Sequence, residues 1–236
     1  MIEIKDLYKK FGKNEVLKGI DLSIGSGGIF SVLGPNGSGK TTLIKCILGM
    51  VIPDAGEIYI DEKPLKNNFK YRHEIDYLPQ IANFPGNLRV EELIAMIKDL
   101  RSSKSTKDQE LIEIFKLRPF LNKKLANLSG GTKQKVNLVL TFMFDSPLVI
   151  LDEPTNGLDP ISHLRLKNLI NSEKEKGKTI LITSHILSFV EEVSDEIVFL
   201  LEGKIYFKGS ITELKTKTDQ PDFEHAIASI LSSSYA

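Results

Sequence analysis

The stretch that decides the fold lies near the amino terminus and reads Gly34-Pro35-Asn36-Gly37-Ser38-Gly39-Lys40-Thr41-Thr42. The apolar run Ile29–Leu33 precedes it and has the character of a buried strand. The run Thr42–Gly49 follows it, is helical in pattern and ends at a glycine. A strand, a glycine-rich loop and a helix in this order are typical of a phosphate-binding loop. The alternative is an ordinary glycine turn before a core helix, and the flanking runs favour the phosphate-binding loop.

Each residue type in this loop has a chemical reason. Gly34, Gly37 and Gly39 permit tight turns and a close backbone approach that a Cβ atom would block. The N–H groups of the loop and of the helix start then point toward an anion. Lys40 supplies a positive charge for the β- and γ-phosphates of a nucleotide, and the Thr41 hydroxyl can hold Mg²⁺.

Composition sets further limits. The chain has 236 residues, enough for one large α/β domain, and its 41% hydrophobic and 26% charged residues are typical of a soluble globular protein. Lys plus Arg and Asp plus Glu both number 31, so the zero formal net charge gives no support for a nucleic-acid partner or an anionic membrane surface. The single Cys46 cannot form an internal disulfide and is expected in the core. Met1–Asp6 does not resemble a signal peptide, and no apolar run approaches the roughly 18 residues of a membrane span. We therefore expect a cytoplasmic protein, for which any membrane role must come through a partner.

Periodicity predicts both strands and helices along the rest of the chain. Strands are predicted at Ile2–Ile4, Gly19–Ile24, Gly56–Asp61, Glu74–Leu78, Leu148–Leu151 and Thr179–Thr183, with a turn at Phe11–Asn14 and a hairpin of Ile197–Leu201 with Lys204–Phe207. Helical character dominates from residue 81 to about 146. Helices are predicted at Val90–Leu100, Lys107–Lys116, Gly131–Phe144 and Pro160–Lys176, an exposed loop at Arg101–Thr106, and two short helices from about Ser210.

The apolar strand Leu148–Leu151 ends in two acids, Asp152 and Glu153. A buried strand delivers Asp152 to the carboxyl edge of the sheet, where α/β proteins bind ligands. Adjacent side chains on a strand point to opposite sides, so Glu153 must reach its target where the chain leaves the sheet. This favours Asp152 for Mg²⁺ and Glu153 for polarising an attacking water. The alternative is a strand-to-helix junction with solvated acids, which the phosphate-binding loop disfavours.

Other polar positions are ambiguous when taken alone. Leu128-Ser129-Gly130-Gly131 precedes a helix and can hold a phosphate, but by itself it favours a plain helix N-cap. Strand order could bring His185, which follows Thr179–Thr183, beside Asp152. A lone histidine at a strand end and a loop amide such as Gln80 are more often structural. Three other histidines match no motif: His73, His163 and His225.

Taken together, these residues resemble the nucleotide-binding subunit of ABC transporters over about residues 1–215. Gly34–Thr42 matches the Walker A motif of that family and Asp152 its Walker B aspartate. Glu153 matches the catalytic glutamate, Gln80 the Q-loop and Leu128–Gly131 the signature motif.

The resemblance extends to loops that carry no signal alone. Gly157-Leu158-Asp159 matches the D-loop and His185 the switch histidine. Phe11 resembles the aromatic residue that stacks on adenine, with Tyr8 the weaker candidate and Val16 packing on the same ring.

One position departs from the family pattern. Thr132 stands where the signature motif has glutamine, whereas Ser129, Gly130 and Gly131, which the family uses on the γ-phosphate, are retained. The stretch Ser129–Val136 and the short tail resemble exporters of the ABC-2 class. Among these they are similar to the ATPase subunit of the Nos exporter, which serves copper-site maturation of nitrous oxide reductase.

The resemblance implies an α/β fold with a P-loop NTPase (RecA-like) core, an antiparallel β subdomain near residues 1–25 and 56–64, and a helical insertion. The single ABC ATPase domain would divide into a core of residues 1–80 and 147–215, a helical subdomain of 81–146 and a C-terminal helical tail of 216–236. It also implies a head-to-tail homodimer with two ATP molecules, each between Lys40 of one subunit and Ser129 of the other. Polytopic membrane permease subunits would be further partners, with the chain peripheral on the cytoplasmic face of the membrane.

The resemblance further implies a ligand set. ATP would contact Phe11, Val16, Asn36, Gly37, Ser38, Gly39, Lys40, Thr41, Thr42, Ser129, Gly130, Gly131 and Asp159. Thr41, Gln80 and, through water, Asp152 would hold Mg²⁺. Glu153 would act as general base, His185 would contact the γ-phosphate, and Gln80 would sense the γ-phosphate and move the helical insertion.

Transport would require a docking surface for the membrane subunit. Apolar residues near the Q-loop could line a groove for one of its cytoplasmic helices, or could equally form the core of the helical insertion: Ile81, Phe84, Leu88 and Leu93. The main alternative function is a soluble ABC ATPase of an assembly or repair complex without transport.

Overall fold

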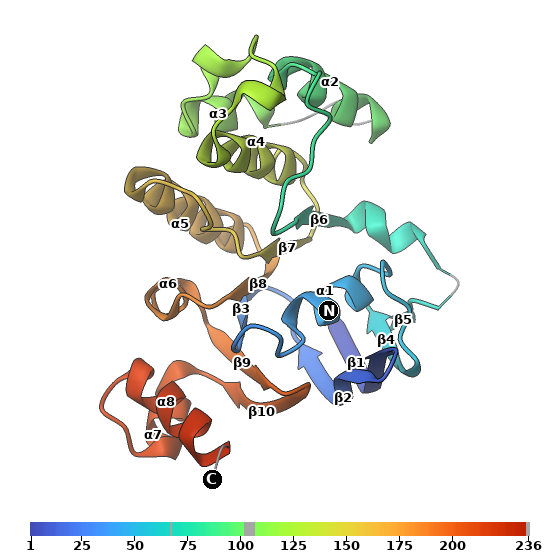
Figure 1. The fold of residues 1–236 in the computed structure, drawn as a ribbon, viewed down its shortest axis with the longest axis vertical. Helices are drawn as coiled ribbons and strands as arrows, with labels where there is room; N and C mark the ends of the chain where they lie inside the picture. Colours follow the sequence, from blue (N-terminus) through green and yellow to red (C-terminus); the bar gives the residue numbers. More distant parts are fainter. Residues whose placement is uncertain (67, 102–106, 235–236) are drawn as a thin grey trace.

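The structure, a computed structural model, describes residues 1–66, 68–101 and 107–234 (Figure 1). A six-stranded sheet lies at its centre in the order β10-β9-β3-β8-β7-β6. Neighbouring strands are parallel except β9 and β10, which form the predicted hairpin. The strands are β3 (Gly28–Leu33), β6 (Ile75–Leu78), β7 (Leu148–Asp152), β8 (Thr179–Ser184), β9 (Glu196–Leu201) and β10 (Lys204–Gly209).

A second sheet confirms the predicted antiparallel layer. Its order is β2-β1-β4-β5, and every neighbouring pair is antiparallel. Helix α1 (Lys40–Ile47), which begins before the predicted start at Thr42, packs with this sheet against one face of the central sheet and buries Cys46 as expected. The strands are β1 (Ile2–Phe11), β2 (Asn14–Ile24), β4 (Ala55–Ile60) and β5 (Lys63–Pro64).

The buried strand β7 shows why the central sheet needs continuous apolar runs. All of its residues are buried. Leu148 and Ile150 join the core shared with α1 and the antiparallel sheet, whereas Val149 and Leu151 join the core beneath the other helices. Because both faces are covered, an alternating pattern would leave polar groups inside, and the unbroken run is what a central parallel strand requires.

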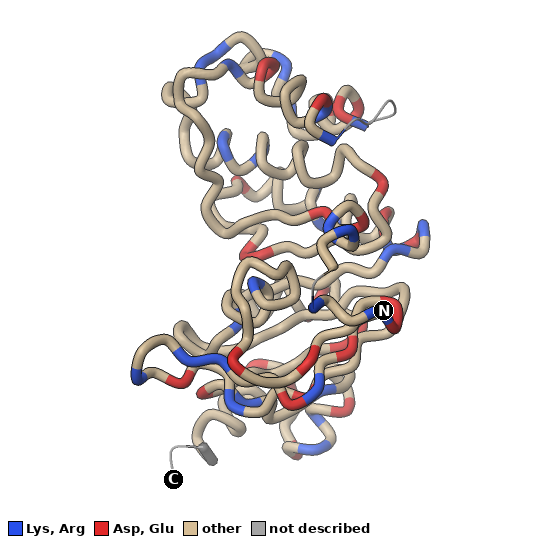
Figure 2. Tube along the Cα trace, turned by 90° about the vertical axis from the view of Figure 1, so that its right-hand side faces the viewer, with Lys and Arg blue, Asp and Glu red and all other residues tan. Residues whose placement is uncertain are grey.

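The described residues between 81 and 146 are mainly helical, as predicted, and lie above the sheets in Figure 1. Figure 2 shows the same arrangement from the side, with charged residues of both signs dispersed along the trace. The inner face of its first helix buries Val90, Leu93 and Ile94. The helices are α2 (Val90–Leu100), α3 (Asp108–Ile114) and α4 (Gly130–Phe142), with 3₁₀ turns at Arg118–Phe120 and Leu125–Asn127. A further 3₁₀ turn, Lys70–Glu74, precedes β6.

Four more helices follow β7. The two short helices predicted after Ser210 are present, whereas α6 was not predicted, because its seven residues give little periodic signal. The C-terminal helices pack against α6 and β10. The four are α5 (Pro160–Glu175), α6 (Leu187–Val193), α7 (Ile211–Thr218) and α8 (Phe223–Ser234).

Arg101 ties the end of α2 to the central sheet. The predicted loop at 101–106 lies outside the described residues except for Arg101. Its side chain is partly buried, pairs with buried Asp76 of β6 and donates to the His73 carbonyl at 3.0 Å. The guanidinium also lies 4.4 Å from the ring centroid of Phe144. Arg101 is therefore a packed residue rather than the freely exposed loop residue that the sequence predicted.

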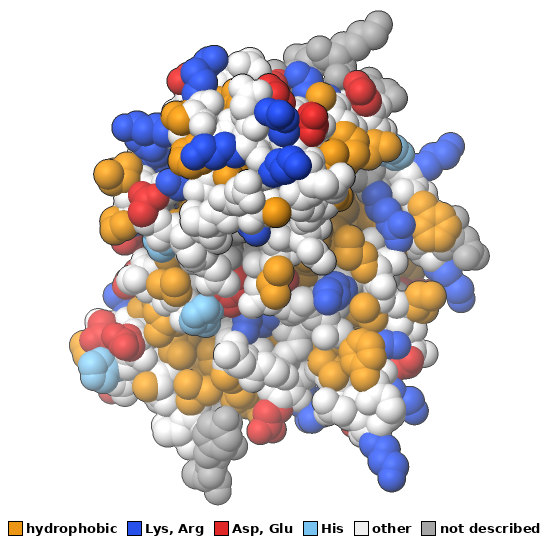
Figure 3. All heavy atoms as spheres, turned by 45° about the horizontal axis from the view of Figure 1, so that its top comes forward, with side chains coloured by type: hydrophobic (Ala, Val, Ile, Leu, Met, Phe, Trp, Pro, Cys, Tyr) orange, Lys and Arg blue, Asp and Glu red, His pale blue; other side chains and the backbone are white. Residues whose placement is uncertain are grey.

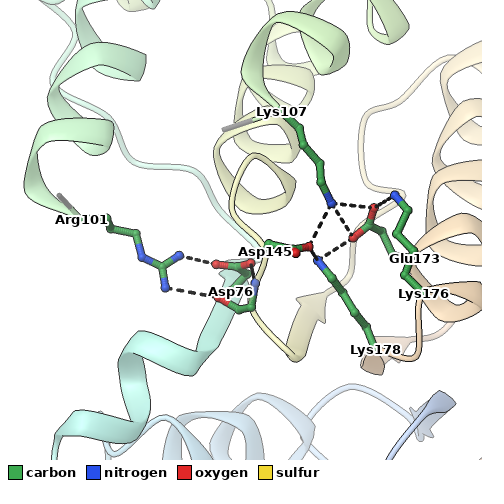
Figure 4. A network of polar contacts seen from close by, with 8 residues as sticks. Asp76, Arg101, Lys107, Asp145, Glu173, Lys176 and Lys178 are labelled. Atoms are coloured by element: carbon green, nitrogen blue, oxygen red, sulfur yellow. Dashed lines mark hydrogen bonds and ion pairs between the residues drawn. The ribbon is translucent and has the colours of Figure 1, made fainter. Parts of the chain in front are cut away.

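A network of lysines and acids makes a second link between the helical part and the sheets (Figure 4). Lys107, which precedes α3, lies 3.0 Å from Asp145 and 3.4 Å from buried Glu173 of α5. Lys178, before β8, contacts the same two acids at 2.9 and 2.6 Å. Hydrogen bonds from Lys178 and Lys107 lower the pKa of Asp145 to about 2. The network thus joins α3, α5 and the start of β8.

The surface carries side chains of every kind. On the face drawn in Figure 3, basic, acidic and apolar side chains lie interspersed, with Lys and Arg most frequent toward the top. Within the described ranges, none of the helices combines the length and the apolar character needed to cross a bilayer.

Candidate functional site

The phosphate-binding loop joins β3 to α1 at the carboxyl edge of the central sheet. A Cβ atom at Gly34 would lie 2.0 Å from the Leu200 carbonyl oxygen, so the loop can pass this strand only as glycine. The Lys40 ammonium is folded onto the loop and donates to the carbonyl oxygens of Gly34 at 2.7 Å and Pro35 at 3.2 Å. These contacts hold the cation over the loop, where a phosphate would replace the carbonyl oxygens as its partner.

A cavity of about 310 Å³ lies against this loop. Most of the residues expected to contact ATP or Mg²⁺ on the P-loop side line it. Asn14 lines it too, and the sequence patterns gave no indication of this residue. The lining residues are Asn14, Val16, Asn36, Gly37, Gly39, Lys40, Thr41, Thr42, Gln80 and Glu153. Ser38 is buried instead, and its hydroxyl has no hydrogen-bond partner among the described residues.

Electrostatics at this cavity favour an anion held near two acids. Burial is the main influence on the Lys40 ammonium and lowers its pKa, while the charges of Glu153 and Asp152 raise it. A bound triphosphate would therefore contact the buried Lys40 ammonium and the N–H groups of the loop. The carboxylates of Asp152 and Glu153 would lie near it.

Asp152 ends β7 with its carboxylate buried. One oxygen, Oδ1, accepts a hydrogen bond from the Thr183 hydroxyl and lies 3.5 Å from the Thr41 hydroxyl. The other, Oδ2, is buried and has no hydrogen-bond partner in the part of the chain that the structure describes. A buried acceptor without a donor is costly, and a cation or a water bound to a cation would satisfy it.

Glu153 leaves the sheet by a left-handed turn. Its φ is +51°, a conformation that residues other than glycine rarely adopt. Its N–H donates to the Thr183 carbonyl at 3.0 Å, and its Oε2 lies 2.8 Å from His185 Nδ1. The sequence predicted that Glu153 reaches its target where the chain leaves the sheet, and this turn is how it does so.

His185 contacts Glu153 and not Asp152, which corrects the expected pairing. The register of β7 with β8 places Thr183 opposite Asp152, so the hydroxyl of Thr183 occupies the position beside that carboxylate. The turn at Glu153 then carries its side chain toward His185, two residues farther along. The neighbouring strands were foreseen, but the register was not.

The signature residues lie at the start of α4. The Ser129 hydroxyl caps this helix by accepting from the Thr132 N–H at 3.3 Å, and it lies 2.8 Å from the Thr132 hydroxyl. Ser129 and Gly130 are exposed. A Cβ atom at Gly131 would lie 2.5 Å from the Gly157 carbonyl oxygen, so this glycine permits close contact with the D-loop. The threonine that departs from the family pattern thus contacts the signature serine directly.

Asp159 of the D-loop makes its contacts with residues of the same chain. Asp159 caps α5 by accepting from the Ser162 N–H at 2.9 Å, and it pairs with Lys135 of α4 at 2.7 Å. The hydrogen bonds from Lys135 and Ser162 hold the pKa of Asp159 well below its usual range. His163, which matched no motif, lies 2.9 Å from the Thr155 carbonyl oxygen through its Nε2 atom. A histidine four residues after a helix cap carries no local signal for this contact.

Phe11 and Tyr8, the candidates for stacking on adenine, differ in their surroundings. Phe11 lies at the end of β1 opposite Asn14, with its ring 51% exposed. Tyr8 hydrogen-bonds Asp6, whose charge is the main cause of a raised Tyr8 pKa. Phe11 is the more exposed of the two, with the Lys9 ammonium 5.3 Å from its ring centroid, and it lies opposite a residue that lines the cavity.

Comparison with known proteins identifies the class to which this fold and site belong. The family model described as "ABC transporter" matches residues 17–156, and a shorter match to a model of an AAA domain covers residues 122–191. The chain is 34% identical over 220 residues to the bacitracin transport ATP-binding protein BcrA of Bacillus licheniformis, covering 92% of this chain and 72% of that protein.

Solved structures of ABC transporter ATP-binding subunits are also similar to this chain. One, of an ATP-binding subunit of an ABC transporter, has a TM-score of 0.89 and 30% identity, covering 97% of this chain and 98% of that one. Another is the dimeric post-hydrolysis state of the ATP-binding cassette MJ0796 bound to ADP and Pi, with a TM-score of 0.81 and 26% identity over 89% and 98% of the two chains.

The chain therefore belongs to the ABC transporter family, as an ATP-binding subunit. The predicted P-loop fold and ATPase activity are confirmed at this level. The finer similarity to the Nos exporter stays a prediction.

Proposed function

We propose that this chain hydrolyses ATP as a head-to-tail homodimer and drives export through separate polytopic permease subunits at the cytoplasmic face of a membrane. The observation that carries the proposal is an incomplete site. The cavity is lined by the phosphate-binding loop, Gln80 and Glu153 but by none of the signature residues, and Ser129 and Gly130 are exposed elsewhere on the chain. A second copy would bring its own Ser129 to the open side of the phosphates.

In this proposal, different residues of the chain bind the γ-phosphate and activate the attacking water. Lys40 moves from the loop carbonyls to the phosphates, and the partner's copy of Ser129 donates from the opposite side. Glu153, a residue that is 4% exposed and lines the cavity, accepts a proton from the attacking water. His185, 2.8 Å from Glu153, orients that carboxylate and reaches the γ-phosphate with its other ring nitrogen.

The residues around Asp152 fit Mg²⁺. A hydroxyl, a carboxylate and an amide oxygen are the hard oxygen ligands that this ion prefers. Thr41 and Gln80 both line the cavity, and the buried Oδ2 atom of Asp152 lacks a donor among the described residues. When bound there, the ion would supply positive charge that offsets the negative charge of the phosphates. Thr41 and Gln80 would bind it directly and Asp152 would hold it through water.

The predicted permease groove needs one correction. Leu93 is 1% exposed and belongs to the core of the helical part, so it cannot line a groove. Phe84 and Leu88 are partly buried against the same core, whereas Ile81, next to Gln80, is 78% exposed. We propose that Ile81 is the apolar contact for a helix of the permease, because an exposed side chain of this size next to the Q-loop is free to be covered.

Replacement of Ile81 tests this assignment. We expect Ile81→Glu to keep the ATPase rate of the isolated protein and to abolish its co-purification with a polytopic protein from detergent-solubilised membranes. Ile52→Glu is the matched control, because Ile52 is 81% exposed at another place on the surface, and it should leave co-purification intact.

Two results would contradict the proposal. Normal co-purification of Ile81→Glu would remove Ile81 from the contact. If the unmodified chain purified with no membrane protein, the alternative of an ABC ATPase without transport would be favoured.

A further inference from the structure

Helix α4 carries three polar side chains on its buried face. Gln134 is 6% exposed, Asn137 is 3% exposed and Thr141 is 3% exposed. Buried amides and hydroxyls are costly unless hydrogen-bonded, so their partners indicate why they are there. None of the three contributes to the ATPase mechanism proposed above.

The two amides reach the loops that carry Glu153 and Gln80. Gln134 Nε2 donates to the carbonyl oxygen of Pro154 at 3.0 Å, one residue after Glu153. Asn137 Nδ2 donates to the carbonyl oxygen of Pro79 at 3.3 Å. That carbonyl belongs to the peptide group that joins Pro79 to Gln80, so the bond fixes the orientation of this peptide.

The hydrogen bond from Gln134 stabilises the left-handed turn at Glu153. Glu153 has a φ of +51°, and such a conformation persists where surrounding contacts enforce it. Thr183 holds the turn on its amino-terminal side through the Glu153 N–H. Gln134 holds the carboxyl-terminal side through Pro154. Loss of either contact would let the Glu153 carboxylate move from its place at the cavity.

We propose that Gln134 and Asn137 are positioning residues, which hold the loops bearing Glu153 and Gln80 in the geometry required for hydrolysis. The inference rests on the proposed roles of Glu153 and Gln80. Because Ser129 caps α4, one helix connects the signature residues with the two catalytic loops of the same chain. The third polar residue, Thr141, donates to the carbonyls of Asn137 at 2.9 Å and Tyr77 at 3.4 Å, within the helix and β6.

Thr141 therefore provides a matched control for a purely structural role. Gln134→Met, Asn137→Leu and Thr141→Val each remove a buried hydrogen bond from α4 with little change of side-chain volume. We expect Gln134→Met and Asn137→Leu to lower kcat for ATP about ten-fold or more, with the Kd for ATP changed by no more than about two-fold, since small displacements of reacting groups are that costly. Thr141→Val should keep kcat, even where its loss of thermal stability is similar.

The outcomes are decisive in both directions. A kcat of Gln134→Met and Asn137→Leu equal to that of Thr141→Val would overturn the inference, and so would a loss of ATP affinity that matched the loss of rate. If Gln134→Met fails to fold, Asn137→Leu alone decides by the same criteria. Glu153→Gln measured in parallel separates the two claims: an active Glu153→Gln would refute the proposed role of Glu153 as base, whereas an inactive one beside an active Asn137→Leu would refute only the positioning role.

Discussion

Glu153→Gln is expected to bind ATP normally and to hydrolyse it about 10²–10⁴-fold more slowly than the unmodified protein, which is the usual contribution of a general base. The amide keeps the size of the side chain and can still contact His185, but it cannot accept a proton from water. Because binding is retained while turnover is lost, the ATP-bound dimer should accumulate. Size-exclusion chromatography with and without ATP, together with a phosphate-release assay, measures both effects.

The control for this substitution is Glu175→Gln, an exposed glutamate near the end of α5. It changes the net charge by the same amount and should leave turnover unchanged. A hydrolysis rate of Glu153→Gln within a few-fold of the unmodified protein would remove Glu153 from the role of base. The structure would then offer His185 as the group to test next, since it lies closest to the Glu153 carboxylate.

Lys40→Ala is expected to lose ATP affinity by about ten- to a hundred-fold, because a hydrogen bond to a charged group contributes roughly 1.5–3 kcal/mol. The free protein uses the same ammonium to satisfy the Gly34 and Pro35 carbonyls, so a modest loss of thermal stability should accompany the change. Isothermal titration with ATP measures the affinity directly.

A second lysine on the same helix provides a control that distinguishes the loss of any positive charge from the loss of the charge at the phosphate-binding loop. Lys45 is exposed on α1, and Lys45→Ala should keep the ATP affinity of the unmodified protein. Equal affinities for Lys40→Ala and the unmodified protein would contradict the assignment of the phosphate-binding loop.

Local patterns predicted much of this molecule because the decisive signals lie within short stretches. The loop around Lys40 is contiguous, and the apolar run before Asp152 identifies a central strand from its composition alone. The prediction that Glu153 must leave the sheet to act also came from local geometry. The structure adds the left-handed turn by which it does so.

Contacts between distant segments were beyond these patterns. Strand order suggested Asp152 as a neighbour of His185, and the contact is with Glu153 instead, because the register of two parallel strands is fixed by packing rather than by either strand alone. Gln134 and Asn137 passed unnoticed, because the carbonyls that they contact lie 20 and 58 positions away in the sequence. The sequence left Leu93 equally open to a groove or to the core of the helical part, since an apolar side chain on a helix gives no indication of whether its face is covered, and the structure places it in the core.

The central claim is that each ATP site is shared between two copies of the chain. Lys40→Ala and Ser129→Asp should each be inactive alone; aspartate keeps the cap of α4 and repels the phosphates. In a mixed dimer, one site combines the intact Lys40 of one subunit with the intact Ser129 of the other.

The most direct test is therefore the ATPase rate of the two variants mixed in equal amounts. The account predicts recovery of activity, about a quarter of the unmodified rate if subunits pair at random. A mixture as inactive as its two components would contradict a shared site.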